Sequence, residues 1–482
     1  MSNLIERLAQ LVLQDNAIFF VGSQFTSGSD QPSYLDQIAD RLAAHLQHAA
    51  PDEQLSAIAQ QYQASAGRAA LIQALKEALA ELPDQTAPVY KLLADSIAPH
   101  TKIITTRFDQ ALETALNQAR KSYIRIISDE EVSFFDESRI SLIKIRGDIS
   151  RADSLLITED DIDDFFKRLP ALNDVVRAFF ATKTLIFLGY DLDDPAFRRF
   201  FREVTPRATE FRRPAYAIVP ASPRSAGYWE QENIVIHAEP VNQFLNTLAE
   251  TVQAASEQPV SGPINPLARL AEPPKPDEPY KSLDSFGRLD KAVFAGRRGA
   301  IERLAHRILA HPVTVLFGES GNGKTSLLQA GVSSRLAQNQ SLLLMTAPIP
   351  GQSLADGWLA DWSKMSDLIG WTGGPVENLT AALRANQARL NGPTVLVLDQ
   401  FEQFFVTYSA GERDTAVTKL CDLLQNEQLN LRLVLVIRED FLGHLQTLET
   451  ALPGLLDIRF RLGRLDEEAA RNAIEHPARP FG

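Results

Sequence analysis

The sequence predicts an α/β protein of two domains, each built on a mostly parallel sheet, and three observations support this. Short apolar runs alternate with helical patterns along most of the 482 residues, as in βαβ units. Residues 256–280 contain seven prolines and few large apolar residues, which is typical of an extended linker. After this linker, a G-x-x-x-x-G-K-T loop stands between an apolar run and a helical run.

Before the linker, six apolar runs are predicted strands and three longer runs are predicted helices. The strands are Ala17–Val21, Lys102–Thr105, Tyr123–Ile127, Leu142–Ile145, Thr184–Leu188 and Ala215–Val219, and the helices are Tyr34–His45, Asp109–Ala119 and Asp160–Lys167. Ligands bind beyond the carboxyl ends of parallel strands. The residues that follow these strands are therefore the candidate site.

After the linker, four apolar runs predict a second sheet. The strands are Val313–Phe317, Ser341–Met345, Thr394–Leu398 and Leu431–Ile437, and a last helix, Asp466–His476, is predicted to end before Pro477. The order of strand, glycine-rich loop and helix around residue 320 is the arrangement that binds phosphate.

The loop that begins at Gly318 has the pattern of a phosphate cradle. Its glycines let backbone N–H groups turn toward a phosphate chain, and Lys324 reaches the terminal phosphates. The Thr325 hydroxyl is suited to bind Mg²⁺, and the following helix adds its positive N-terminal end. The sequence therefore predicts an ATP or ADP site with Mg²⁺, formed by Gly318, Glu319, Ser320, Gly321, Asn322, Gly323, Lys324, Thr325 and Ser326.

Two later strands of this domain end in charged residues that suit the same site. The third strand is followed by Asp399, a candidate Mg²⁺ ligand of the Walker B type, and by Glu402, which is placed to orient an attacking water. The fourth strand is followed by Arg438, which is suited to pair with a γ-phosphate. A surface ion pair between Arg438 and Asp440 is the alternative.

Residues 279–482 resemble the nucleotide-binding unit of STAND proteins, a family of signal-transduction ATPases. The matching segments are PYKSL from residue 279, GESGNGKT from 318, VLVLDQFEQFF from 395 and VIREDFL from 436. The resemblance implies a switch that is a closed monomer with ADP and an assembled oligomer with ATP. It also implies that Gly296 and Arg297 lie near the base and ribose. STAND proteins usually continue into a winged-helix domain and a repeat sensor, so we expect either a fragment or a separate sensor.

The expected domain bounds are 1–250 for the first domain, 251–285 for the linker and leading segment, 286–463 for the nucleotide-binding domain and 464–482 for the start of a helical subdomain. The net charge of −13 argues against a protein built mainly to bind nucleic acid. The single cysteine, Cys421, excludes an internal disulfide. Because we find no signal peptide and no apolar run of membrane-spanning length, we expect a cytoplasmic protein without membrane contact.

Motifs at the ends of the N-terminal strands resemble, as a set, the sirtuin-like domains of bacterial anti-phage defence proteins. They are Val21–Gln24, Gln31–Tyr34, Thr105–Asp109, Lys144–Asp148 and Phe187–Tyr190, the last continuing to Pro195, in the order and spacing of that family. The resemblance spans residues 10–245 and implies a Rossmann-like fold with a pocket for NAD. It implies that this pocket is formed by Gly22, Ser23, Thr105, Thr106, Arg107, Asp109, Arg146, Gly147, Asp148, Gly189 and Asp191.

Three positions depart from the family pattern. Gln24 replaces a glycine of the first loop, Arg107 replaces an asparagine, and Arg146 replaces the histidine that serves the family as general base. A guanidinium stays protonated near neutral pH, so Arg146 cannot exchange a proton as imidazole does. Either the two arginines favour an anionic ligand such as a phosphorylated nucleotide, or they form structural ion pairs with Asp109 and Asp148.

Together these features predict an ATP-binding STAND switch of anti-phage defence. Its sirtuin-like module is expected to have lost NAD⁺ cleavage and to serve assembly or ligand binding, and its ATPase activity is expected to be slow or limited to a single turnover. The expected partners are further copies of the chain and a phage-derived trigger or a separate sensor or effector protein. The alternative is an ATP-switched NAD⁺ hydrolase that depletes NAD⁺ in infected cells.

Overall fold

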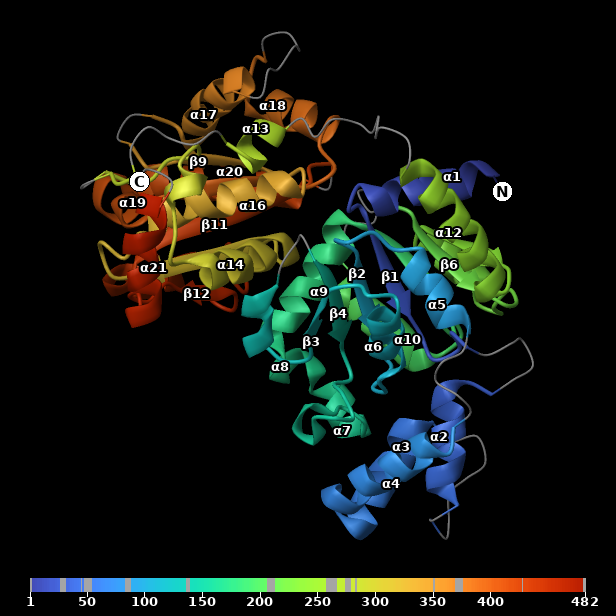
Figure 1. Ribbon diagram of the computed structural model, residues 1–482. Coiled ribbons are helices and arrows are strands. Elements are labelled where there is room, and N and C mark those ends of the chain that lie inside the picture. Colours follow the sequence, from blue (N-terminus) through green and yellow to red (C-terminus); the bar gives the residue numbers. More distant parts are fainter. Residues whose placement is uncertain are drawn as a thin grey trace. The chain divides into compact units, whose positions relative to one another are not determined.

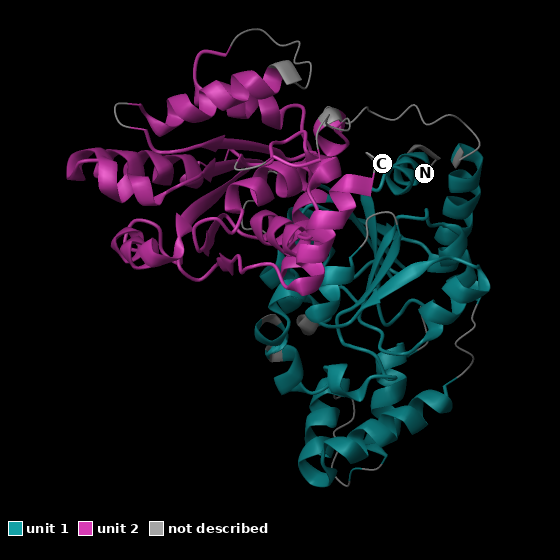
Figure 2. Ribbon diagram, turned by 60° about the vertical axis from the view of Figure 1, so that its left-hand side comes forward, with its two compact units in different colours: residues 1–173, 183–262 teal, residues 174–182, 263–482 magenta. Residues whose placement is uncertain are grey.

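The chain divides into two compact units (Figure 2). Unit 1 comprises Met1–Asn173 and Lys183–Gly262, and unit 2 comprises Asp174–Thr182 and Pro263–Gly482. The division after Gly262 falls within the predicted linker. The structure, a computed structural model, describes residues 2–26, 32–44, 46, 54–82, 88–135, 139–205, 213–256, 267–273, 279–281, 284–349, 352–368, 376–426 and 428–479.

Unit 1 is built on a seven-stranded sheet in the order β3-β4-β2-β1-β5-β6-β7, in which neighbouring strands are parallel (Figure 1). All residues of β1, β2, β4, β5 and β6 are buried, as expected for parallel strands covered on both faces. The strands are β1 (Ala17–Val21), β2 (Lys102–Thr105), β3 (Tyr123–Ile126), β4 (Ile140–Lys144), β5 (Thr184–Leu188), β6 (Ala215–Val219) and β7 (Ile234–Ala238).

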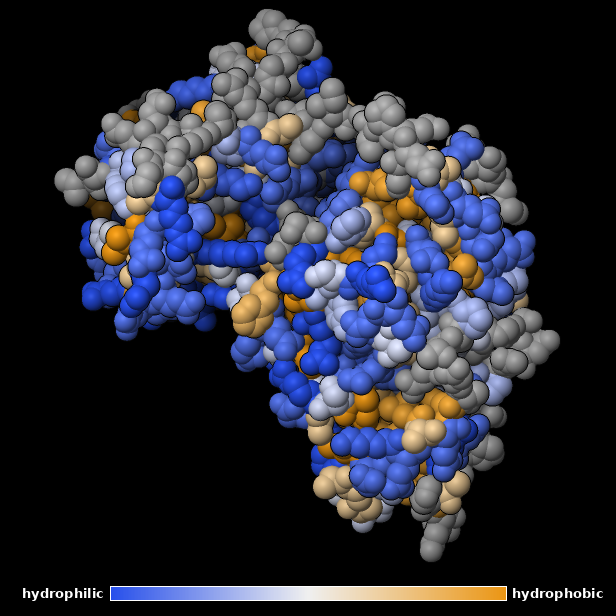
Figure 3. Space-filling model, viewed as in Figure 1, coloured by the Kyte–Doolittle hydropathy of each residue, from blue (hydrophilic) through white to orange (hydrophobic). Residues whose placement is uncertain are grey.

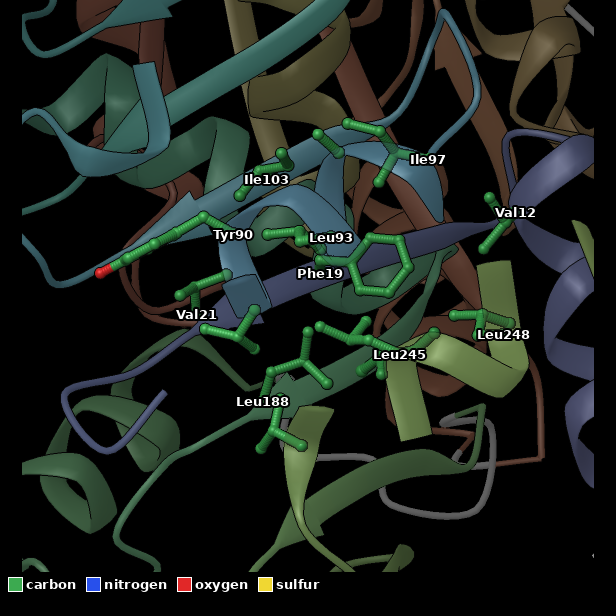
Figure 4. Close-up of a cluster of buried hydrophobic side chains, with 14 of the residues drawn as sticks. Val12, Phe19, Val21, Tyr90, Leu93, Ile97, Ile103, Leu188, Leu245 and Leu248 are labelled. Atoms are coloured by element: carbon green, nitrogen blue, oxygen red, sulfur yellow. The ribbon is translucent and has the colours of Figure 1, made fainter. Parts of the chain in front are cut away.

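Helices surround this sheet. They are α1 (Ser2–Leu13), α2 (Tyr34–Ala43), α3 (Leu55–Ala66), α4 (Arg68–Ala80), α5 (Pro88–Asp95), α6 (Ala111–Gln118), α7 (Glu159–Asp163), α8 (Phe165–Arg168), α10 (Pro195–Val204), α11 (Ala226–Gln231) and α12 (Val241–Ser256). Helix α9 (Pro170–Thr182) begins in unit 1 and continues from Asp174 in unit 2. The amphipathic helices α1, α5 and α12 bury their apolar stripes in one core with Phe19 of β1. Val12, Leu93 and Leu245 belong to this core (Figure 4).

Helices α2, α3 and α4 form a small helical group that follows the carboxyl end of β1. Ile38 of α2, Ile58 of α3 and Leu75 of α4 are buried in a second apolar cluster, together with Phe108 from the segment after β2. The group is therefore anchored to the edge of the sheet where the strands end, which is the edge expected to bind ligands.

Unit 2 contains a five-stranded parallel sheet in the order β12-β8-β11-β10-β9. Its strands are β8 (Val313–Gly318), β9 (Leu342–Thr346), β10 (Thr394–Leu398), β11 (Leu431–Arg438) and β12 (Arg459–Arg461). Its helices are α13 (Ala268–Ala271), α14 (Arg298–Ala310), α15 (Lys324–Ser326), a π-helical segment (Leu327–Val332), α16 (Ser333–Gln338), α17 (Leu354–Leu368), α18 (Leu379–Gln387), α19 (Glu402–Thr407), α20 (Ala410–Gln425) and α21 (Glu467–Ala478).

Successive residues of the central strands of unit 2 fill two different cores. Leu396 and Leu435 pack in one cluster with Trp358 of α17, whereas Val397 and Val436 pack in another with residues of α14. This alternation is the period of two that a strand imposes on its side chains. The sheet is therefore covered on both faces, and its carboxyl edge remains for the glycine-rich loop.

The structure differs from the sequence predictions in several elements. Strands β7 and β12 were not predicted, and the predicted helix Asp160–Lys167 is two short helices, α7 and α8. The last helix continues through Pro477 to Ala478, because a proline in the last turn removes only one hydrogen bond. Part of the predicted extended linker is the short helix α13, whose neighbour Leu267 is buried.

The surface in the view of Figure 3 is mostly hydrophilic, with smaller hydrophobic areas. Large apolar side chains that are exposed include Phe134, Val406 and Ile474. Among the residues that the structure describes, no helix combines the length and the apolar character that a membrane crossing requires.

Candidate functional sites

The glycine-rich loop of unit 2 has the conformation that its sequence predicts. It connects β8 to α15, and Gly321 and Gly323 adopt φ angles of 81° and 83°, which favour glycine. The ammonium group of Lys324 donates hydrogen bonds of 3.0 Å to the backbone carbonyls of Gly318 and Glu319. Lys324 therefore lies folded over the loop.

The loop is joined to the end of β10 by a short hydrogen bond. The Thr325 hydroxyl donates to Oδ2 of Asp399 over 2.7 Å, and Asp399 is 7% exposed. Burial raises the pKa of Asp399, although the hydrogen bond from Thr325 opposes this rise. Two oxygens so close together suit Mg²⁺, which usually takes one or two protein oxygens and completes its shell with phosphates and water.

The protein would supply only part of the coordination of a Mg²⁺ ion at this place. Within the described ranges, no cluster of three or more His, Cys, Asp or Glu side chains is arranged to hold a metal ion. The remaining ligands of a Mg²⁺ ion at Thr325 and Asp399 would therefore come from a bound nucleotide and from water. The residues present fit a nucleotide-dependent metal site.

Arg438 and Glu402 lie at the same edge of the sheet as the loop. The register of β11 against β8 pairs Arg438 with Gly318, and the backbone N–H of Arg438 donates to the Glu402 carboxylate over 3.2 Å. The Arg438 guanidinium binds both carboxylate oxygens of Asp440, at 3.1 and 2.7 Å. The ion pair considered as an alternative is thus present, and a role of Arg438 at a γ-phosphate stays a prediction.

The glycine-rich loop is also tied to the segment that leads from β12 to α21. The Asn322 side chain donates to the carbonyl of Leu462 over 3.0 Å, and a Cβ at Gly318 would lie 2.5 Å from the same carbonyl. Arg464 pairs with Glu319 at 2.9 Å. Sequence reasoning missed these contacts, because nothing in the sequence marks residues 462–464 as neighbours of the loop.

Arg297 bridges the same two segments, whereas Gly296 packs elsewhere. The Arg297 guanidinium donates to the carbonyls of Gly463 and Asn322 over 2.9 and 3.1 Å. Gly296 has a φ of 79°, and a Cβ there would lie 2.3 Å from the carbonyl oxygen of Ala469 in α21. A position of these two residues near the base and ribose stays a prediction.

Unit 1 contains a cavity of about 690 Å³ at the carboxyl ends of its strands, within the range of small-molecule sites. Its wall comes from the ends of β1, β2, β4 and β5 and from α2, α3, α7, α8 and α10. The lining residues are Ser23, Leu35, Gln54, Ser56, Thr106, Ile145, Arg146, Leu156, Glu159, Asp160, Ile162, Phe165, Tyr190, Asp191, Asp194, Phe197, Arg199, Phe200 and Glu203.

Four of the residues predicted to form the sirtuin-like pocket line this cavity: Ser23, Thr106, Arg146 and Asp191. The other seven do not. Gly22 and Gly189 serve the packing of two loops instead, since a Cβ at Gly22 would lie 2.5 Å from the Gly189 carbonyl and one at Gly189 would lie 2.4 Å from the Phe25 backbone. The N–H of Gln24 donates to the Gly189 carbonyl over 2.8 Å, which closes this contact.

Arg107 does not line this cavity and forms a buried ion pair. It is 3% exposed and lies 2.6 Å from the Asp109 carboxylate. Its guanidinium carbon lies 3.7 Å from the centre of the Tyr34 ring. Asp109 also accepts from the N–H of Ala111 at the start of α6. The alternative of a buried ion pair is therefore the one that the structure shows for Arg107.

The second expected pair, between Arg146 and Asp148, does not form. Asp148 lies 2.6 Å from Lys144 and 3.3 Å from Arg125 of β3. Burial alone would raise the pKa of Asp148, but hydrogen bonds from Lys144 and Ser150 hold it well below its usual range. Asp148 thus forms its ion pairs with Lys144 and Arg125 and not with Arg146.

Two further predicted pocket residues are fixed by backbone contacts. The Thr105 hydroxyl donates to the carbonyl of Val21 over 2.9 Å. Gly147 has a φ of 76°, and a Cβ there would lie 2.1 Å from the Ser154 carbonyl. Both residues therefore shape the loops beside the cavity without lining it.

Arg146 lies half-buried on the cavity wall. Among the described residues, none forms a hydrogen bond or an ion pair with its guanidinium that meets standard geometry, and burial lowers its pKa while the charge of Asp194 raises it. The sequence missed the aromatic wall beside it, formed by Phe165, Tyr190, Phe197 and Phe200. The aromatic residues that follow Gly189 in the sequence, among them Tyr190, Phe197 and Phe200, could have indicated this wall.

Comparison with known proteins gives a family match in each half of the chain. Residues 279–482 match the family model described as Novel STAND NTPase 1, and residues 101–237 match that of the SIR2-like domain. The chain is 27% identical over 201 residues to Defense-associated sirtuin 2 of Bacillus subtilis, which covers 39% of this chain and 19% of that protein. It is 24% identical over 220 residues to NAD(+) hydrolase ThsA of Enterococcus faecium, covering 45% of each.

The chain thus matches less than half of the length of these two curated relatives. Among solved structures, one from a study of the mechanism and regulation of Sir2 enzymes is 13% identical, with a TM-score of 0.31, and covers 54% of this chain and all of that one. From the two family matches, the chain contains a SIR2-like domain followed by a STAND NTPase domain, as the resemblances in its sequence predict.

Proposed function

We propose that this protein is an ATP-controlled switch in anti-phage defence. The observation that carries the proposal is the hydrogen bond of 2.7 Å between Thr325 and Asp399, because it brings the end of the glycine-rich loop and the end of β10 together as a nucleotide–Mg²⁺ site requires. The defence role is supported by the name of the relative Defense-associated sirtuin 2.

In this proposal the backbone N–H groups of the loop bind the phosphates of ATP. Lys324 gives up its bonds to the carbonyls of Gly318 and Glu319 and turns to the phosphates. Thr325 and Asp399 hold Mg²⁺, which supplies positive charge against the phosphate oxygens. Glu402 orients water, and slow hydrolysis returns the switch to the ADP state.

The contacts between the loop and residues 462–464 offer a route from nucleotide to assembly. Asn322 and Arg297 connect the loop to the backbone of Leu462 and Gly463, and these residues lead directly into α21. If the loop moves to accept phosphates, these hydrogen bonds must either break or pull residues 462–463 along with the loop. We propose that this displacement of α21 prepares the chain to form homo-oligomers.

Unit 1 serves this switch as a ligand-binding or assembly module in our proposal. Arg146 occupies the cavity wall at the position where the family resemblance implies a general base, and a guanidinium does not titrate near neutral pH. The SIR2-like domain is therefore expected to keep a pocket without the usual cleavage of NAD⁺.

The test of the switch is the Lys324→Ala variant. With purified protein, ATP and Mg²⁺, the wild type is expected to bind a fluorescent ATP analogue and to form larger particles in mass photometry. Lys324→Ala should weaken binding by at least about 100-fold and stay monomeric. Lys364→Ala, an exposed lysine of α17, is the matched control and should behave as wild type. A Lys324→Ala protein that still assembles with ATP contradicts the proposal.

A second candidate function is an ATP-switched NAD⁺ hydrolase. It is favoured by the names of three relatives, each an NAD(+) hydrolase ThsA, with 22–24% identity over 194–220 residues. The two functions differ in one measurement, the loss of NAD⁺ over time in the presence of assembled protein. Consumption of NAD⁺ that stops in Arg146→Ala would favour the hydrolase and contradict the loss of cleavage.

A further inference from the structure

The cavity of unit 1 carries a surplus of negative charge, which opposes a phosphorylated ligand. Its lining contains five carboxylates, from Glu159, Asp160, Asp191, Asp194 and Glu203, against two guanidinium groups, which leaves an excess of three negative charges. The partners of Asp160 and Asp194 include the side-chain amides of Gln60 and Gln54, at 2.7 and 3.1 Å. A neutral amide satisfies a carboxylate oxygen without cancelling its charge.

The helix that follows β1 also offers little to a phosphate. An anion usually binds at the free N–H groups of such a helix. In α2, however, the N–H of Asp36 donates to the Ser33 hydroxyl and the N–H of Ser33 donates to the Asp36 carboxylate, over 3.2 and 2.9 Å. The N–H of Tyr34 donates to the Ser23 carbonyl over 3.0 Å. The helix start is thus closed by its own capping box, which places a carboxylate there.

These observations do not fit NAD, which the SIR2-like domain implies. The pyrophosphate of a dinucleotide would meet a negative cavity and a capped helix, and Gly22 of the first loop packs against Gly189. We therefore derive no reaction of NAD in this cavity. The inner wall, by contrast, suits a flat ring without phosphate.

The inner wall combines aromatic surface with one half-buried guanidinium and one buried hydroxyl. Tyr190 and Phe197 lie with ring centroids 4.6 Å apart, and the Tyr190 hydroxyl is buried near Thr106 with no hydrogen-bond partner of standard geometry in the described structure. Tyr190 is 6% exposed. Beside it, the Arg146 guanidinium presents donors, and Asp191 and Asp194 present acceptors.

Guanine matches this combination of groups. Its O6 and N7 are paired acceptors for an arginine fork, and its amino group is a donor that carboxylates accept. A flat purine also has a face for an aromatic wall. We propose that the cavity binds a guanine nucleoside that carries no phosphate, with the base near Arg146 and the acidic residues toward its amino and hydroxyl groups. This inference rests on the proposed function, in which unit 1 is a ligand-binding or assembly module, and it specifies the ligand.

Calorimetric titration of the full chain with guanosine, GMP and NAD⁺ tests the proposal. The Lys324→Ala variant is used throughout, so that the glycine-rich loop does not bind the phosphorylated compounds. Guanosine is expected to bind at least about tenfold more tightly than GMP, which differs from it by one phosphate, and NAD⁺ should bind more weakly still. Binding of GMP or NAD⁺ that equals or exceeds that of guanosine overturns the proposal, as does the absence of guanosine binding at millimolar concentration.

Two substitutions locate the site. Arg146→Ala should lower guanosine affinity by about tenfold or more, whereas Arg139→Ala, an exposed arginine of the same unit, should leave it unchanged. The double variant Asp191→Asn, Glu203→Gln should raise GMP affinity toward that of guanosine, because it removes two negative charges from the rim. If the arginine variants bind guanosine equally, or GMP affinity does not rise, the assignment to this cavity fails. Failure here leaves ATP-driven assembly untouched, since that is measured separately.

Discussion

The ammonium group of Lys144 lies 2.6 Å from the carboxylate of Asp148, and both side chains are almost wholly buried. The pair joins the end of β4 to the loop four residues later, and the intervening segment carries Arg146 onto the cavity wall. Glu113 of α6 lies 2.7 Å from the same ammonium group. A buried cation thus fixes the loop that presents Arg146.

Replacing Lys144 with methionine should strongly destabilise unit 1. The substitution keeps an apolar chain of similar length but leaves two carboxylates without their buried partner, which typically costs about 3–5 kcal/mol. Hydrogen exchange of β2 and β4 peptides in increasing urea measures the effect within unit 1. Lys167→Met removes a lysine that is 82% exposed and lies 3.2 Å from Asp164, so it should remain close to wild type. Equal stability of the two variants would show that the buried Lys144–Asp148 ion pair does not stabilise unit 1.

Glu113 should make the stability of unit 1 depend on pH. Burial raises the pKa of Glu113 from 4.5 to about 6, although Lys144 opposes the rise. Since the folded pKa is the higher one, the folded state binds more protons between these values. Stability is therefore full below about pH 4.5 and falls as pH rises through about 6, by about 2 kcal/mol.

The Glu113→Gln variant checks this dependence. It should lose the fall in urea stability of unit 1 between pH 4.5 and 7, because the amide does not titrate. Glu250→Gln, at an exposed position of α12, should keep the wild-type profile. The idea is wrong if stability rises with pH in this window or if Glu113→Gln leaves the profile unchanged.

Gly189 should tolerate no side chain. Its φ is 62°, and a Cβ at this position would lie 2.4 Å from the Phe25 backbone. Alanine must therefore strain the backbone, at about 1–3 kcal/mol, and push the first loop away from β5. Gly227→Ala in α11 is a matched control, since nothing lies within 4 Å of its Cβ position and alanine favours a helix. Thermal unfolding should show a clear loss for Gly189→Ala and none for Gly227→Ala; similar melting temperatures would contradict the packing argument.

Much of the fold could be read from the sequence because its central strands are buried on both faces. Ala17–Val21 is wholly apolar, and Thr184–Leu188 and Thr394–Leu398 are apolar after their first threonine. The structure gives these strands the same bounds. Strand β12 was missed because it is three residues long and buries only Phe460 between two exposed arginines. Apolar pattern alone does not mark such a strand.

Candidate site residues could be proposed from the sequence only where one short motif contains the chemistry. In the loop from Gly318 to Thr325, the spacing of the glycines, the lysine and the threonine indicates the conformation of the backbone. Its residues could therefore be proposed from the sequence alone. The partner of Asp148 could not be assigned in this way, because the choice between Arg146 and Lys144 depends on where the chain turns after β4. Arg125 reaches Asp148 from β3, and this contact depends on the register of β3 against β4.

Asp399 should be needed for turnover more than for binding. Asparagine keeps an acceptor for the Thr325 hydroxyl but removes the charge that holds Mg²⁺. Asp399→Asn should therefore bind ATP within about tenfold of wild type and lose at least about 100-fold in Mg²⁺-dependent hydrolysis. Phosphate release under single-turnover conditions measures this. Asp414→Asn, at an exposed position of α20, is the control, and unchanged hydrolysis in Asp399→Asn would remove the Walker B assignment.

Arg438 should give the protein its preference for ATP over ADP by pairing with the γ-phosphate. Its ion pair with Asp440 should limit this preference. Both residues are about half exposed, so the pair is worth little, about 0–1 kcal/mol, and a γ-phosphate beside Gly318 can compete for the guanidinium. Arg438→Ala should bind ATP and ADP with similar affinity, whereas Asp440→Asn should raise the preference for ATP by no more than about fivefold. Competition binding of the two nucleotides gives both ratios. An Arg438→Ala protein that prefers ATP as strongly as wild type would show that Arg438 is only a partner of Asp440.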